Sequence, residues 1–409
     1  MRRNSLIVLS CLAALWLPPA DCSIPAVELL WAAQQAAGPR EAAASGARAV
    51  AAVRTLVDER GGRLDWSRVS DQIVFGMFRR SGDRRADIYV MRSDGSGQRC
   101  LTCDKAGVPQ AGNDQPVWHP SGRYIVFQSV NPDLPVPSLL PDALVDALTQ
   151  GGAGFHNNLW AMTPDGREFH RLTDIGEGEA TLHPQFSHDG RKLLWAAYER
   201  DGAPPARGGR WRGGRRARGG GGQWSLKIAD FAEGAAPRLS NIQTFRPRGE
   251  RQTFYEGHGF SPDDRKIIFS ASIGREHPFD LDIWTLELAP SRLVQLTNSP
   301  GVWDEHAHYS PGGGHIAWIS SDGFAFTPTM NYGRSLATEL WIMRADGSEK
   351  RRLTHFNDSG HVEATGGRTI VADNAWNRDG SRIAAVLGIV GGDSQMRSRI
   401  ALIDLGRQY

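Results

Sequence analysis

The sequence predicts an all-β protein, a six-bladed β-propeller of four-stranded antiparallel blades that is closed by an N-terminal strand. Three observations lead to this prediction. A unit of one aromatic residue, a polar turn and an apolar run recurs six times, and a unit with an Asp-Gly turn alternates with it. The last copy lacks its final strand, for which the N-terminal part offers a candidate. The six aromatic residues are Trp66, Trp118, Phe186, Phe260, Tyr309 and Trp376.

The first residues of the chain predict export. The chain has 409 residues and a formal net charge of +2, which implies no general attraction to nucleic acid or membranes. Residues 1–23 resemble a signal peptide, with a basic start before the apolar stretch from Leu6 to Leu17. We therefore expect a periplasmic or secreted protein with no transmembrane span after cleavage. A lipid anchor on Cys22 is the less favoured alternative, because Pro19-Ala20-Asp21 is a poor lipidation signal.

The segment after the signal leads into the ring. Residues 24–50 are Ala-rich and are expected to form a linker or a short helix. The propeller is expected over residues 51–409. Arg54-Thr55-Leu56-Val57 resembles the outer strands of later units, so it is the candidate for the strand that completes the last blade. Removal of residues 46 to 60 is therefore expected to lower thermal stability sharply.

Each full unit predicts two hairpins, because period-two apolar runs alternate with turn residues. The first hairpin turns at segments such as Ser261-Pro262-Asp263-Asp264, and the second at pairs such as Asp94-Gly95. Four strands, A to D, therefore form each blade. Because the strands are antiparallel, all B–C and D–A connections should lie on one rim, where binding loops are usually found. Three long B–C insertions belong to that rim: 130–157, 199–223 and 321–338.

A Gly/Arg-rich tract lies within the insertion 199–223. Such tracts resemble segments that follow nucleic acid strands. In an exported protein we expect instead a loop without fixed structure, in contact with anionic glycan or lipid headgroups. Nucleic acid is therefore not an expected partner.

Two cysteines remain after the predicted signal peptide, Cys100 and Cys103. In an oxidising compartment such a pair can close a small disulfide, and free structural thiols are the alternative. The pair flanks a predicted strand position and not a helix N-terminus, which argues against a redox-active thiol. Without a second pair, no zinc site is expected here.

The repeats resemble the TolB-like (WD40-like) β-propeller repeat in the segments DIYVMRSDGSGQRCLT, FSPDDRKIIFS and ELWIMRADGSEKRRLT. The resemblance covers about residues 54 to 404 and implies a fold more than an activity. Neither the N-terminal domain of TolB nor a peptidase domain is expected, and no G-x-S-x-G segment occurs. We therefore expect a monomeric, non-enzymatic binding or scaffold propeller of the bacterial cell envelope. A protein partner or an envelope glycan should meet its loop-rich face.

Polar side chains gather in the five positions before each aromatic residue. These positions begin strand A near the central channel, so side chains from several blades should converge there. The structural alternative is that each of them only hydrogen-bonds the next blade. The expected binding residues at the channel mouth are Asp114, Gln115, His183, Glu256, Glu305, Asp373 and Asn374.

The expected metal ligands are His258, His306 and His308. The last two are separated by two positions in a predicted strand, so both rings should point to the same side. Imidazole-rich sites suit Mn²⁺ or Zn²⁺ better than Ca²⁺, so the candidate cofactor is a divalent Mn or Zn ion, against the alternative that none is bound. His119, His188 and His315 instead fall at or near the tight A–B turns and are expected to be solvated turn residues.

A second resemblance suggests an enzyme. The segments GHGFSP and DEHAHYS look similar to metal-binding segments of oligogalacturonate lyases, which are propellers of a similar repeat type. This resemblance implies the alternative function, a metal-dependent carbohydrate-active enzyme that works by β-elimination. His183 would then abstract a proton, while an Arg or the metal offsets the charge of the substrate carboxylate. The chain departs from the pattern at Trp303, where the family has a Gln ligand, and in its smaller number of blades.

Overall fold

The computed structural model describes residues 49–58, 60–78, 85–134, 154–200, 222–248, 253–328 and 335–409. The predicted signal peptide (1–23), Cys22 and nearly all of the predicted linker (24–50) lie outside the described residues, as do parts of the three long insertions. The described segments contain strands and turns but no helix, and therefore no helix that could cross a membrane.

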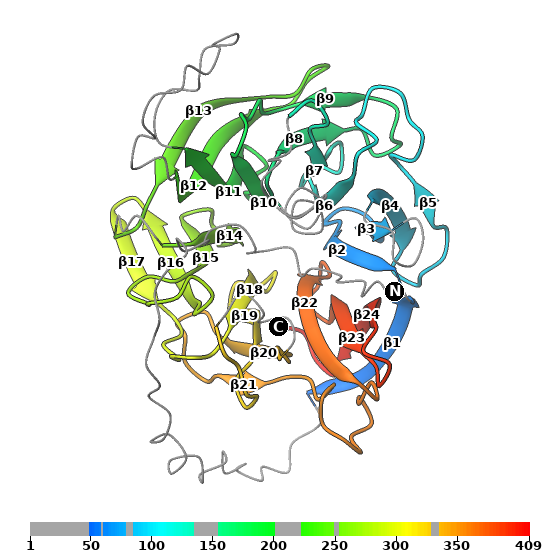
Figure 1. Cartoon of the computed structure of the whole chain (residues 1–409), viewed down its shortest axis with the longest axis vertical. Coiled ribbons are helices and arrows are strands. Elements are labelled where there is room, and N and C mark those ends of the chain that lie inside the picture. The colour runs from blue at the N-terminus through cyan, green and yellow to red at the C-terminus, as the bar shows by residue number, and fades with distance from the viewer. Residues whose placement is uncertain are drawn as a thin grey trace, which may run out of the picture.

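The strands form a ring of six four-stranded antiparallel sheets, which confirms the predicted fold class (Figure 1). Blade 1 contains β2 (Gly61–Trp66), β3 (Gln72–Phe78), β4 (Ala86–Arg92) and β5 (Arg99–Cys100). Blade 2 contains β6 (Asn113–Trp118), β7 (Ile125–Val130), β8 (Asn157–Met162) and β9 (Phe169–Arg171). Blade 3 contains β10 (Ala180–Phe186), β11 (Lys192–Arg200), β12 (Gly222–Ala232) and β13 (Arg238–Phe245).

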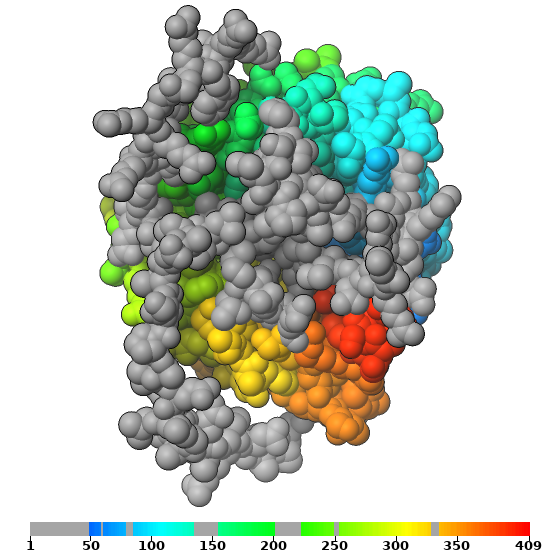
Figure 2. All heavy atoms as spheres, viewed as in Figure 1, coloured from blue at the N-terminus to red at the C-terminus, as the bar shows by residue number. Residues whose placement is uncertain are grey.

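The remaining blades complete the circle, and the same order of colours surrounds the molecule in Figure 2. Blade 4 contains β14 (Tyr255–Phe260), β15 (Lys266–Ala271), β16 (Asp282–Leu288) and β17 (Ser291–Gln295). Blade 5 contains β18 (Asp304–Tyr309), β19 (His315–Ser320), β20 (Glu339–Arg344) and β21 (Arg351–Arg352). Blade 6 contains β22 (Arg368–Trp376), β23 (Arg382–Val390), β24 (Met396–Leu405) and β1 (Val50–Val57).

The N-terminal strand closes the ring, as predicted. β1 pairs antiparallel with β24, with Val53 opposite Ile403, and is the outer strand of blade 6. In Figure 1 the blue β1 lies beside the red β24. Val57 is buried in the same apolar cluster as Leu64 and Trp66 of blade 1. The first strand of the chain therefore holds the last blade against the first.

One hydrogen bond is repeated in all six A–B turns and explains the repeated sequence unit. The residue after each aromatic donates its backbone N–H to the carbonyl oxygen five residues later, at 2.8 to 3.0 Å. A polar turn of fixed length is therefore needed after each aromatic residue. The donors are Ser67, His119, Ser187, Ser261, Ser310 and Asn377.

The repeated Leu-Thr pairs join the two outer strands of a blade. Thr102 Oγ1 donates to the carboxylate of Asp87 at 2.8 Å and accepts the backbone N–H of Ile88 at 3.0 Å. Three other blades have the same arrangement, in which the polar partner stands fifteen positions before the threonine. These pairs are Thr173 with Asn158, Thr297 with Asp282, and Thr354 with Glu339.

The apolar core is divided among the six interfaces between neighbouring blades. Each of six buried clusters takes its side chains mainly from two successive blades, such as Trp118 of blade 2 against Val74 and Ile88 of blade 1. The burial of large apolar side chains between the sheets holds the ring together. The axis, where the inner strands of all blades meet, is left to polar side chains.

Two sequence-based expectations on single residues can be compared with the structure. Cys100 and Cys103 form a disulfide bond, in agreement with the small bridge that an oxidising compartment allows. His119 is not a solvated turn residue, and that expectation was wrong. Its ring is 2 % exposed, lies 4.7 Å from the ring of Phe186, and bonds the carbonyl oxygen of Gly190 at 2.9 Å. It joins the turn of blade 2 to blade 3.

Candidate metal centre

Every inner strand is irregular near its start, and this irregularity positions the site. The pairing register shifts in all six inner strands about three residues before the aromatic residue. Gln115, His183 and His306 there have φ angles of 51°, 51° and 50°. A β-bulge adds an unpaired residue and redirects its side chain. As a result His183 of blade 3 and His306 of blade 5 meet, with ring centres 5.1 Å apart.

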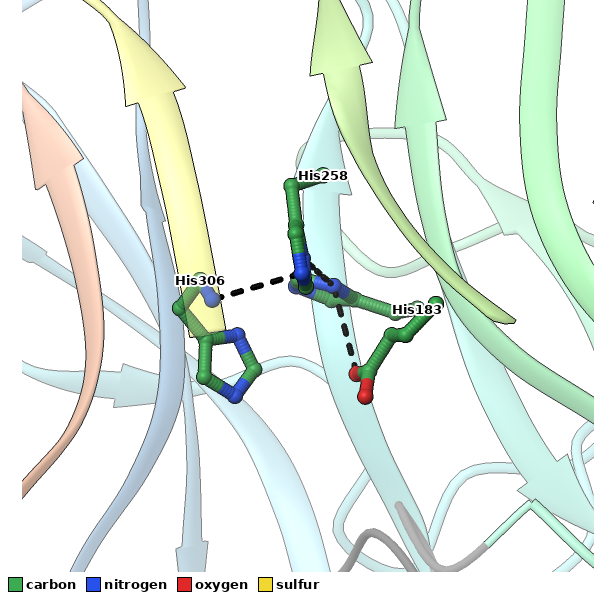
Figure 3. A group of neighbouring side chains, drawn as sticks. His183, His258 and His306 are labelled. Atoms are coloured by element: carbon green, nitrogen blue, oxygen red, sulfur yellow. Dashed lines mark hydrogen bonds and ion pairs between the residues drawn. The ribbon is translucent and has the colours of Figure 1, made fainter. Parts of the chain in front are cut away.

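Four metal-binding side chains gather at this place (Figure 3). One ligand atom from each of His183, Glu256, His258 and His306 lies within 4.8 Å of the others, and all four residues are buried. Nδ1 of His183 lies 3.2 Å from Nδ1 of His258 and 3.5 Å from Oε1 of Glu256. The four donors come from β10, β14 and β18, so three successive blades contribute to one group.

The ring of His258 is fixed at its other nitrogen. Nε2 lies 2.7 Å from the hydroxyl of Ser270 on β15 and 3.3 Å from the backbone N–H of His306. Nδ1 therefore faces His183 (Figure 3). A polar group on the far nitrogen is the usual way in which a protein orients an imidazole ligand.

Arg63 is the residue of this site that sequence analysis missed. It lies on β2 and is 7 % exposed, and its Nη1 is 2.6 Å from Nε2 and 3.2 Å from Nδ1 of His306. The same Nη1 donates to the carbonyl oxygen of Ala372. A signal for it was present, because Arg63 stands three residues before Trp66, as His306 does before Tyr309.

The predicted carboxylates are buried beside the histidines. Oε2 of Glu305 lies 3.1 Å from Nε2 of His306 and accepts the indole N–H of Trp303 at 3.1 Å. Burial raises the pKa of Glu305, against a hydrogen bond with Glu256 that lowers it. Two buried carboxyl groups in such contact do not both ionise readily. Trp303, where the lyase pattern has a Gln, therefore serves to hold a carboxylate.

Two aspartates add to this negative charge. Burial raises the pKa of Asp114 to about 7 and that of Asp373 to about 6, although the Arg63 charge lowers both. Oδ1 of Asp373 lies 3.8 Å from Nδ1 of His306. The ionised forms of these groups are therefore destabilised unless a cation is near them.

His308 is not one of the four neighbouring donors. The register shift between Glu305 and His308 interrupts the strand alternation on which the prediction for His306 and His308 depended. The ring of His308 instead belongs to a second group with His183 and Asp373, and its Nε2 is 3.9 Å from Oδ1 of Asp373. The three histidines predicted as ligands thus do not all fall in one group of neighbouring donors.

The predicted amide residues position the backbone of the histidines. Oε1 of Gln115 accepts the N–H of His183 at 2.7 Å, and the Asn374 amide donates to the carbonyl oxygen of His306 at 2.7 Å. Asp114 accepts the N–H of Gln115 at 2.8 Å. These contacts cross from blade to blade. Like the histidines, these residues are buried within the ring, with at most 4 % exposed.

The histidines at the axis are neutral at pH 7. Burial lowers the pKa of His183, His258 and His306 well below the ordinary 6.5, and the charge of Arg63 acts in the same direction. Burial also lowers the pKa of His308 to about 4. A neutral imidazole keeps one nitrogen lone pair, which is the form that binds a metal.

The donor set fits a divalent ion. When ionised, the buried Asp114, Glu256, Glu305 and Asp373 carry four negative charges against one positive charge on Arg63, a net −3 that a divalent ion would reduce to −1. Ligands bound at about 2.1 Å to one ion are themselves about 3 to 3.5 Å apart. The donor atoms of Glu256, His258 and His306 lie within 4.8 Å of one another, which is close to that spacing.

Comparisons with known proteins give matches at low sequence identity. No protein-family model matches the chain. An uncharacterized protein of Agrobacterium fabrum is 24% identical over 278 residues, which cover 67% of this chain and 84% of that protein. An oligogalacturonate lyase in complex with manganese has a TM-score of 0.46 at 13% identity, over 87% of this chain and 93% of that chain.

Two further solved structures have similar scores. The oligogalacturonate lyase of Vibrio parahaemolyticus has a TM-score of 0.45 at 11% identity, over 86% of this chain and 93% of that chain. A puromycin-hydrolyzing peptidase of Mycobacterium tuberculosis has a TM-score of 0.46 at 11% identity, over 87% of this chain and 54% of that chain.

Proposed function

We propose that this chain is a metal-dependent enzyme that acts at the propeller axis on an acidic oligosaccharide, by β-elimination. The observation that carries the proposal is the buried group of His183, Glu256, His258 and His306, which lies beside the further buried carboxyl groups of Asp114, Glu305 and Asp373. If these side chains only held neighbouring blades together, there would be no need for four donors of metal-binding types from three blades to lie so close to one another. An ion at the axis would bind the lone pairs of the histidines and would balance the negative charge of the buried carboxylates.

In this proposal the ion is Mn²⁺ or Zn²⁺, and Glu256, His258 and His306 hold it. Two of the three histidines that the sequence predicted as ligands, His258 and His306, are kept in this set. Glu256 takes the place of His308, which belongs to the second donor group with His183 and Asp373. Neutral imidazoles with a carboxylate suit either metal. The bound ion would supply positive charge to the carboxylate of the substrate, which stabilises the electron-rich form that proton removal creates.

His183 is the proposed proton acceptor. Its Nδ1 is directed at Oε1 of Glu256, 3.5 Å away, so the ring proton belongs on Nδ1 and Nε2 keeps the lone pair. Nε2 lies 3.4 Å from the amide nitrogen of Gln185, a contact that a substrate can replace. Nε2 would take the proton from the carbon beside the sugar carboxylate. The electron pair of that C–H bond then forms the new C=C bond, and the C–O bond to the neighbouring sugar breaks toward its oxygen.

Elemental analysis and a lyase assay test this function together. Purified full-length protein should contain close to one Mn²⁺ or Zn²⁺ per chain and should raise the ultraviolet absorbance of uronic-acid oligomers as unsaturated product forms. His258→Ala should lose metal and turnover together, whereas His183→Gln should keep the metal and lose turnover. The variant His315→Ala changes a half-buried histidine at the A–B turn of blade 5, outside the donor group, and serves as the control with both properties intact. Absence of metal and of turnover in the wild type would contradict the proposal.

A non-catalytic binding module is the second candidate, and the burial of the donors favours it. Each of the four side chains is at most 4 % exposed, which suits an ion that only holds the blades together. In this case the loop-rich face of an exported, TolB-like propeller would bind a protein or an envelope glycan. Stoichiometric metal without turnover on any uronic-acid oligomer, in a protein recovered from the periplasm, would favour this function over the enzyme.

A further inference from the structure

We propose that Arg63 competes with the divalent ion for His306, and that an anionic group of the substrate draws Arg63 away, so that metal and anion bind cooperatively. This inference rests on the proposed metal centre and adds its regulation. Arg63 is then the residue that makes the metal site sensitive to the charge of the substrate.

The competition follows from the position of the guanidinium. Nη1 of Arg63 lies 2.6 Å from Nε2 and 3.2 Å from Nδ1 of His306, so the guanidinium lies close against the imidazole ring. A metal bound to either ring nitrogen at about 2.1 Å would therefore lie next to the guanidinium. Two cations this close to one neutral imidazole repel each other. Arg63 must therefore leave His306 before His306 can become a ligand.

Charge strengthens this competition. Arginine stays protonated in proteins, so Arg63 cannot avoid the conflict by losing a proton. An ion on His306 would lie roughly 4 Å or less from the present position of Nη1, and repulsion between two buried cations at that separation is large. The effect of Arg63 on its neighbours is already visible, because its charge lowers the pKa of His306 and His308.

An anion offers Arg63 another partner. A guanidinium binds a carboxylate through two parallel hydrogen bonds, which outweigh a single bond to a neutral imidazole. A substrate carboxylate at the axis would therefore take Arg63 from His306 and leave that ring for the metal. Because binding free energies are reciprocal, the metal would increase the affinity for the anion by the same factor.

The test measures Mn²⁺ affinity by electron paramagnetic resonance of the free ion, on the full chain, with and without galacturonate. In the wild type, saturating galacturonate should lower the Mn²⁺ Kd by about tenfold. Arg63→Gln should bind Mn²⁺ about tenfold more tightly than the wild type without galacturonate, and galacturonate should then have no effect. Arg92→Gln, which removes the same charge from the exposed end of β4 in the same blade, should behave as the wild type.

A second variant at Arg63 and a salt control complete the test. Arg63→Lys retains the charge without the planar fork, so it should keep the weak Mn²⁺ affinity and lose most of the galacturonate effect. Sodium chloride at matched ionic strength replaces galacturonate in the control. Equal or weaker Mn²⁺ binding by a folded Arg63→Gln would overturn the competition while leaving the metal centre in place. No Mn²⁺ binding by any of these proteins would instead remove the proposed function itself.

Discussion

Nδ1 of His183 and Nδ1 of His258 lie 3.2 Å apart, although the two residues are 75 positions apart in sequence and belong to different blades. Each ring is neutral, because burial lowers its pKa well below 6.5. Two neutral imidazole nitrogens this close share one proton in a hydrogen bond. The same contact therefore stabilises the metal-free protein and places His183, the proposed base, directly beside His258, a proposed metal ligand.

The anchor of His258 should control metal affinity. Ser270→Ala removes the hydroxyl 2.7 Å from Nε2 of His258, so the ring loses its fixed orientation. We expect metal affinity to fall by about 10- to 100-fold, as measured by competition with a chelator. Ser272→Ala is the matched control, because Ser272 accepts the backbone N–H of Phe254 at 3.1 Å and does not contact the cluster. Equal affinities of the two variants would contradict this role for Ser270.

A charge placed on β1, the strand that closes the ring, should lower protein stability at Val57 but not at Val53. Val57 is 7 % exposed against blade 1, whereas Val53 is 36 % exposed on the outer edge. Val57→Asp buries an unpaired carboxylate at the closure and should lower the free energy of unfolding by about 3 kcal/mol. Val53→Asp should change it by about 0.5 kcal/mol or less. Chemical denaturation measures both, and similar losses in the two variants would mean that β1 does not hold the ring.

Blade 1 should tolerate no side chain at Gly76. A Cβ there would lie 2.0 Å from Oδ1 of Asp114 and 2.8 Å from its Cγ, so Asp114 of blade 2 would have to move. Gly76→Ala should therefore lower the melting temperature by several degrees, and the added change Asp114→Ala should recover part of the loss. Gly314→Ala, where a Cβ meets nothing within 4 Å, is the control. Strictly additive losses in the double variant would show that the two positions do not interact.

Asp114 should make stability fall as pH rises. Burial raises its pKa to about 7 in the folded protein, above the ordinary 3.8 of an unfolded chain. A raised folded pKa gives stability that is present below the unfolded value and is lost as pH rises through about 7. Asp114→Asn keeps the oxygen that accepts the N–H of Gln115 but does not titrate. In the presence of chelator its stability relative to wild type should increase from about pH 5 to about pH 8. A difference that does not vary with pH would refute the assignment.

Most of the fold could be predicted from sequence, because its signals are local. The turn after each aromatic residue is closed by a bond that spans five residues, so the repeat of Ser261 and its equivalents is the repeat of that bond. The closing strand was also predictable, since Thr55 and Leu56 resemble the outer strands of other blades. The burial of His119 was not, because its partners Gly190 and Phe231 come from blade 3.

The sequence by itself determined which residue types begin the inner strands, and thereby that histidines and carboxylates would converge on one axis. Only the tertiary structure decided which of them meet. Register shifts in the inner strands turn His306 toward His258 and separate it from His308, and the closed ring brings Arg63 of blade 1 against His306 of blade 5. A repeat in sequence fixes the unit, but the distance between two units across a ring depends on the backbone irregularities and the packing of every blade between them.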